Sequence, residues 1–369
     1  MNKKFLSYFF LLGTILGICP RNEQHICRKR GKKTHHFKIY TSFIILLMLW
    51  QFAYFVWLVL GDYYVEGLFI KFLIELLDVA VLTMDITLTI FFINFTQHKK
   101  WKSMNKYLNV VENQLISYCA SIDSGILGHV YIDICFITVI ITITNASMLW
   151  IFCSHSRCFF FLHIQKVYGC YMIVLVYLIV TRIRNGLTKL HAFLEGLTPS
   201  KIGEEDSNVK FIQPYNSYSE FMKCYRIIYD VVQFFNDIFG YHMVFLNLFC
   251  ILEWLSVLNL IISSIKYNSM EIDVITVMFI NIIIILIGII FIILLCASVT
   301  SKAEHFLYVL HQIEDDNHNL KAKSIVIQLV EDMPLHFSAA RFFNISKYTI
   351  LGLIGNCTTY FIVLIQFYQ

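Results

Sequence analysis

The chain has 369 residues, of which 58% are hydrophobic and 15% are charged, and its mean hydropathy is +0.66. A soluble chain usually holds about 45–50% apolar and about 25% charged residues, so a soluble fold would leave apolar surface that it cannot bury. The composition predicts an integral membrane protein and excludes a disordered, collagen-like or disulfide-rich secreted chain. The net charge of +4 says little as a sum.

The first element is a short apolar stretch from Phe5 to Ile18 that ends at Pro20. It follows Lys3 and Lys4, which is the order found in a secretory signal peptide. However, no convincing small-residue cleavage site precedes Pro20, and cleavage would translocate a segment rich in Lys and Arg. We expect a short membrane-interface helix here, with a cleaved signal peptide as the alternative.

Seven further stretches are long and apolar enough to cross a bilayer, which takes about 20 residues. They are 39–60, 68–96, 130–152, 162–181, 241–265, 274–297 and 345–367. The helical patterns of the fourth, fifth and sixth continue past the apolar part, for example over residues 185–197 and 301–313. We therefore expect a second, water-facing helical layer on one side of the membrane.

The orientation follows from the distribution of Lys and Arg, which favour cytosolic loops. These residues gather in alternating segments, with nine in 1–38, four in 97–129, seven in 182–240 and four in 298–344. The loops on the other side hold only Arg157 and Lys266. The sequence thus predicts an all-α membrane protein with seven transmembrane helices, a cytosolic N-terminus and an extracellular C-terminus.

Three parts of the chain follow from this topology. Residues 1–38 form a cytosolic N-terminal segment, residues 39–344 form a six-helix membrane domain with cytosolic extensions, and residues 345–369 form the seventh helix. The two extracellular cysteines, Cys153 and Cys158, could form a disulfide, because their compartment permits one, or stay reduced.

Several function classes are disfavoured. The inferred orientation is the reverse of that of a G-protein-coupled receptor, and all four prolines lie outside the spans. The sequence has no nucleotide-binding loop, no metal-ligand spacing and no nucleophile with its base. We therefore expect neither an enzyme nor a cofactor, a bound metal or a nucleic-acid partner.

The last span carries a short signature in which Thr359-Tyr360 is followed by five apolar residues and then Gln366-Phe367. This resembles the C-terminal signature of insect gustatory receptors, chemoreceptors related to insect odorant receptors. The resemblance implies a ligand-gated, poorly selective cation channel, a homo- or heterotetramer with other receptor subunits, in the plasma membrane of sensory dendrites. Its partners would be a small-molecule tastant, membrane lipid and permeant cations, and the last helix of each subunit would line the pore.

Spacing within this span agrees with a pore-lining role. Gly355, Thr359, Ile362 and Gln366 are four, three and four residues apart, so they share one helix face. A pore needs wettable positions and an apolar constriction, and we expect the gate at Ile362, Gln366 and Phe367. The alternative is a close-packed seam between helices, which small residues also favour.

A ligand site is sought in the outer half of the membrane domain, where the resemblance implies an outward-opening pocket among spans two to six. The second span carries Lys71, Glu75, Asp78 and Asp85 on one stripe, which predicts either a buried polar network or one wall of such a pocket. The candidate ligand-binding residues, chosen by depth and chemistry, are Glu75, Asp78, Thr142, Asn145, Lys166, Tyr171, Asn259 and Asn281.

The ligand class is suggested by one departure from the family pattern. Sugar-sensing members commonly place an acidic residue directly after the Thr-Tyr pair, whereas this chain has Phe361 there. We expect a bitter or other non-sugar compound. An odorant receptor subunit that needs a coreceptor is the first alternative, and a G-protein-coupled receptor is the second.

Overall fold

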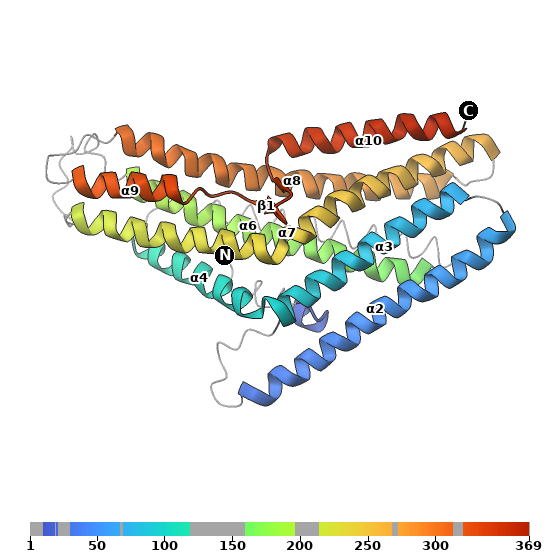
Figure 1. Cartoon of the computed structure of the whole chain (residues 1–369), viewed down its shortest axis with the longest axis horizontal. Helices are drawn as coiled ribbons and strands as arrows, with labels where there is room; N and C mark the ends of the chain where they lie inside the picture. Colours follow the sequence, from blue (N-terminus) through green and yellow to red (C-terminus); the bar gives the residue numbers. More distant parts are fainter. Residues whose placement is uncertain are drawn as a thin grey trace.

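The computed structural model describes residues 10–18, 20, 30–66, 69–118, 159–195, 214–267, 272–312 and 320–368. A short helix at residues 10–15 precedes the labelled elements. In chain order these are α2 (Arg30–Glu66), α3 (Phe69–Phe91), the π-helix η1 (Phe92–Thr96), α4 (His98–Tyr118), α6 (Phe159–Glu195), α7 (Pro214–Tyr267), α8 (Ile272–Gln312), α9 (Leu320–Asp332), β1 (Ser338–Ala339), β2 (Phe343–Asn344) and α10 (Lys347–Tyr368) (Figure 1). The predicted all-α membrane fold is confirmed.

Within the described residues, five helical stretches are long and apolar enough to cross a membrane. They are His36–Trp57, Leu76–Thr96, Tyr168–Leu194, Tyr218–Asn259 and Ile282–His311. These stretches overlap the predicted first, second, fourth, fifth and sixth spans. The predicted third span, residues 130–152, lies outside the described residues, as do Cys153 and Cys158. The predicted seventh span corresponds to α10, which is not among the five.

Four of the helices that contain these stretches, α2, α6, α7 and α8, are much longer than a bilayer requires. Helix α7 has 54 residues and is therefore about 80 Å long, against about 30 Å for the hydrocarbon core. Helices α6 and α8 continue to Glu195 and Gln312, so the predicted extension of the helical patterns is confirmed. In Figure 1, α4 and α9 lie towards the end of the bundle opposite the C-terminus, beside these extensions.

The extensions pack around aromatic side chains. Phe306 of α8 stands edge-on to Phe221 and Tyr225 of α7, with ring centroids 5.6 and 6.2 Å apart. Next to this layer, Arg182 of α6 donates from Nε to Glu112 of α4 at 2.7 Å, and the Arg182 side chain is only 5% exposed. A charge this deeply buried requires a partner, so this pair fixes how α4 crosses α6.

The N-terminal segment is anchored in the bundle. Gly17 has a φ of +72°, and a Cβ there would lie 2.6 Å from Ile44 Cδ1, so a side chain would strain both the backbone and the packing. Asn94, in the π-helix, donates to the carbonyls of Gly17 and Ile18 at 3.0 and 3.2 Å, and Tyr168 donates to that of Leu16. Where this segment lies relative to a membrane surface stays a prediction.

Candidate functional site

Within the described part of the chain, one face of α10 is left uncovered. Gly355, Thr359, Ile362 and Gln366 are all exposed, Ile362 by 52%. The Thr359 hydroxyl donates to the Gly355 carbonyl at 2.9 Å, which ties it to its own helix while its oxygen can still accept a hydrogen bond. The structure therefore brings these residues together on one exposed face, as their spacing predicts.

The opposite face of α10 holds the helix against α7 and α8. Leu353 is 4% exposed and Cys357 is half-buried, and both lie about 160–200° around the helix from Gly355. Tyr360, which we expect to pack against a neighbouring helix, is 49% exposed in the single chain. Phe367 belongs to α10, but its side chain lies outside the described part. A helix covered along one side only can meet water, lipid or another subunit along the other.

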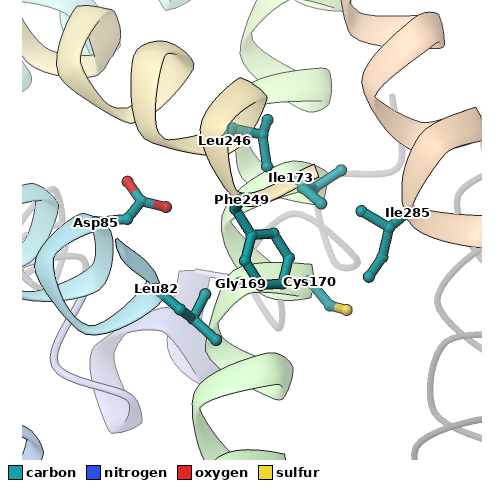
Figure 2. Close-up of a pocket in the computed structure, with 8 residues that line it drawn as sticks. All are labelled: Leu82, Asp85, Gly169, Cys170, Ile173, Leu246, Phe249 and Ile285. Atoms are coloured by element: carbon teal, nitrogen blue, oxygen red, sulfur yellow. The ribbon is translucent and has the colours of Figure 1, made fainter. Parts of the chain in front are cut away.

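A narrow pocket opens where four helices meet. It is lined by Leu82 and Asp85 of α3, Gly169, Cys170 and Ile173 of α6, Leu246 and Phe249 of α7, and Ile285 of α8. In Figure 2, Asp85 lies at the edge opposite Ile285, and the Phe249 ring lies at the centre, in front of α6 and between Leu82 and Ile285. Apart from Asp85 the side chains in this lining are apolar, and the space between them is about 10 Å³, which is room for about one water molecule.

The one carboxylate at this pocket is paired with a histidine. His242 Nδ1 of α7 lies 2.8 and 2.9 Å from the two carboxylate oxygens of Asp85, and both residues are almost fully buried. Thr89 donates to Asp85 from one turn further along α3, at 3.4 Å. Buried ionisable groups in a membrane protein need such partners. Asp85 thus belongs to a buried polar network, the first alternative for its stripe, while an outward-opening pocket wall at Glu75 and Asp78 stays a prediction.

The structure places the predicted ligand-binding residues unevenly. Tyr171 on α6 and Asn259 on α7 are buried, and Asp78 on α3 is half-buried. Three more candidates lie on described helices, but their side chains are outside the described part of the structure. They are Glu75, Lys166 and Asn281. Thr142 and Asn145 lie outside the described residues altogether. The pocket in Figure 2 contains none of these candidates, so their role stays a prediction.

Sequence reasoning missed His242. It stands at the edge of the predicted fifth span, and an ionisable residue inside a span deserves a functional hypothesis by default. Its partner could not be identified, because Asp85 lies 157 positions earlier in the chain.

Two solved structures are similar to this chain. The structure of the insect olfactory receptor OR5 from Machilis hrabei matches with a TM-score of 0.69 and 14% sequence identity, over 99% of this chain and 98% of that one. The same receptor in complex with eugenol matches with a TM-score of 0.64 and 13% identity over the same shares. At these identities the likeness shows a shared fold. Among curated proteins, no sequence matches this chain.

The family is shown by a sequence model rather than by the fold. The model of the 7tm chemosensory receptors matches residues 6–369, which is nearly the whole chain and includes the uncovered helix α10, the pocket and the N-terminal segment. This is a family of receptors and not of enzymes. The chain belongs to the seven-transmembrane chemosensory receptor family, the group that contains the insect gustatory and odorant receptors.

Proposed function

We propose that the protein is a gustatory receptor, a tastant-gated and poorly selective cation channel built from four subunits. The observation that carries the proposal is the uncovered face of α10, which presents Gly355, Thr359, Ile362 and Gln366 away from the helices that hold it. The signature Thr359-Tyr360 to Gln366-Phe367 on the same helix supports the gustatory subtype. The site of action would be the plasma membrane of a sensory neuron dendrite.

The chemistry of this face suits a pore. Glycine and threonine give small and wettable positions, whereas a ring of four Ile362 side chains would form an apolar constriction that closes by losing its water. Gln366 offers a neutral dipole without a ring of charge, which agrees with weak discrimination among cations. Ligand binding opens such a gate only if the ligand binds the open state more tightly than the closed one.

The ligand we propose is a bitter or other non-sugar compound. Phe361 occupies the position after the Thr-Tyr pair where sugar-sensing members commonly carry an acid.

The test is current recording from cells that express the full chain, during a screen of bitter, sugar and volatile compounds. Replacing Ile362 or Gln366 with alanine should change the evoked current or its ion selectivity. The matched control is Asn356→Ala, since Asn356 is exposed on α10 but lies about 100° around the helix from Gly355. Evoked current that is unchanged by both pore-face variants would refute the pore assignment.

An odorant receptor subunit is the second candidate, because the solved structures named above are of an olfactory receptor. Current that requires co-expression of a coreceptor, evoked by volatiles, would favour it. A G-protein-coupled receptor would instead place the C-terminus in the cytosol. Labelling of a C-terminal tag on intact cells separates that class from both channel types.

A further inference from the structure

The segment that leads into α10 is fastened to α7. We call residues 333–346, between α9 and α10, the connector. Tyr225 of α7 donates to the carbonyl of Met333 at 2.9 Å. Asn236, three turns further along α7, donates to the carbonyl of His336 and accepts from the amide of Ser338, both at 2.9 Å. A side-chain amide that bonds the backbone in both directions fixes the position as well as the orientation of that backbone.

The turn of the connector also lies directly on α7. A Cβ at Gly240 would be 2.7 Å from the amide nitrogen of Ala340 and 3.0 Å from its Cα. Ala340 and Arg341 hold the turn between β1 and β2 with φ of 49° and 65°, a conformation that costs free energy in residues other than glycine. The two backbones are therefore in direct contact at this point, so a movement of α7 towards the turn would displace the turn.

Two residues beyond Gly240, the same helix contacts a residue that lines the pocket. His242 bonds Asp85 through Nδ1, and Asp85 lines the pocket. A separation of two residues puts Gly240 and His242 about 200° apart around α7, on nearly opposite sides. Residues 236–242 span about 9 Å of helix and carry the connector on one side and α3 on the other.

We propose that residues 236–242 of α7, here named the coupling segment, transmit the state of the pocket to the pore helix. Asn236 and His242 act in it as positioning residues. A ligand that alters the Asp85–His242 contact would move the coupling segment, and the connector and the start of α10 would move with it. The inference rests on the proposed function, since it gives the direction in which a tastant signal would travel.

The test uses hydrogen–deuterium exchange on the purified full-length protein and requires no ligand. Asp85→Leu removes the carboxylate without touching the connector. It should speed exchange in residues 337–346, where the amides of Ser338, Phe342 and Ile345 are hydrogen-bonded, by at least about fivefold, the lower end of known coupling between sites. Asp85→Asn keeps an acceptor for His242 and should exchange as the wild type does.

Coupling between two sites is reciprocal, so the opposite direction gives a second measurement. Asn236→Ala should speed exchange in residues 82–89 of α3 by a similar factor, although Asn236 bonds only the connector among the contacts described above. The control is Thr188→Val, which removes the hydrogen bond that Thr188 of α6 accepts from Lys302 of α8 and should change neither segment. If Asp85→Leu does not fold, the comparison of Asn236→Ala with its control still tests the coupling.

Unchanged exchange of the connector in Asp85→Leu, or equal loosening of the connector by Thr188→Val, would overturn the inference and leave these contacts as static packing. A different result would refute the assignment as a channel. A wild-type chain that carries no current with or without a coreceptor would refute the proposed function, while the exchange result would still decide whether the pocket and the connector are coupled.

Discussion

Helices α6 and α10 are both strongly apolar, yet the chain treats them differently. From Tyr168 to Leu194, α6 is buried on almost every side by α3, α4, α7 and α8. Helix α10 touches α7 and α8 along one face only, and Leu351, Ile354 and Ile362 are more than half exposed. Apolar composition therefore says that a helix avoids water but not what covers it. The uncovered helix is the one that carries the family signature.

The largest effect on stability is expected at the buried ion pair between α6 and α4. Glu112→Ala would leave the guanidinium of Arg182, 5% exposed, without its carboxylate and with the hydrogen bond to Asn109 at 2.8 Å still in place. We therefore expect a cost of about 3 kcal/mol, the low end for breaking a buried ion pair. We expect a large drop in the melting temperature of the solubilised protein, which size-exclusion chromatography after heating would measure. Replacing both residues, with Arg182→Met and Glu112→Leu, should recover most of the loss.

The control is an ion pair that is more exposed. Lys100 and Asp237 are 2.6 Å apart, but their side chains are 39% and 31% exposed. Asp237→Ala should therefore cost no more than about 1 kcal/mol. Equal melting shifts for Glu112→Ala and Asp237→Ala would show that burial at α6 does not set the strength of its contacts.

The two faces of α10 give the next largest effect. Leu353→Ala removes a buried side chain and should cost about 2 kcal/mol, the low end for such a change, because a lipid environment weakens the hydrophobic contribution. Leu351→Ala, at 65% exposure, should leave the melting of the protomer unchanged. If Leu351 lies in a subunit interface, its replacement should lower the tetramer fraction in cross-linking experiments. Equal melting temperatures for the two variants would contradict the difference in burial between the two faces of α10.

A smaller effect is expected at the contact between α7 and the connector. Gly240→Ala forces two backbones apart and should cost about 1–3 kcal/mol, as overpacking does. Gly288→Ala is the matched control, because the added Cβ would meet a flexible side-chain methyl of Ile173, at 3.3 Å, rather than a backbone. We expect Gly240→Ala to alter evoked current as well as thermal stability, whereas Gly288→Ala should leave both close to wild type. Current that is insensitive to Gly240→Ala would argue against the coupling segment.

Local sequence patterns could predict much of this arrangement. Hydropathy alone located five of the spans that the structure describes as apolar helices, and helical periodicity predicted that α6 and α8 continue beyond the membrane. The spacing of Gly355, Thr359, Ile362 and Gln366 predicted their common face. Each of these rests on residues within a few turns of one another, where helix geometry fixes the relation.

Contacts between distant parts of the chain could not be predicted in the same way. Asp85 meets His242 across 157 positions, and Asn236 meets the connector across about 100. The sequence shows that each side chain needs a partner, but the choice depends on how α3 and α7 cross. Gly240 is a further case, since nothing near it in the sequence indicates that another backbone passes against it.

The smallest effect on stability is expected for glycine-to-alanine changes, which should act in opposite directions on α10 and α6. Among the described residues, nothing lies within 4 Å of a Cβ placed at Gly355, whereas a Cβ at Gly186 of α6 would meet Val111 at 3.1 Å. Alanine is the better helix former by up to about 1 kcal/mol, so Gly355→Ala should slightly raise the melting temperature of the protomer, and Gly186→Ala should not. In a pore, however, four added methyl groups would narrow the path at this level, so single-channel conductance should fall. A variant that is more stable and conducts as the wild type does would place Gly355 away from the ion path, on a lipid-facing or subunit-facing side of α10.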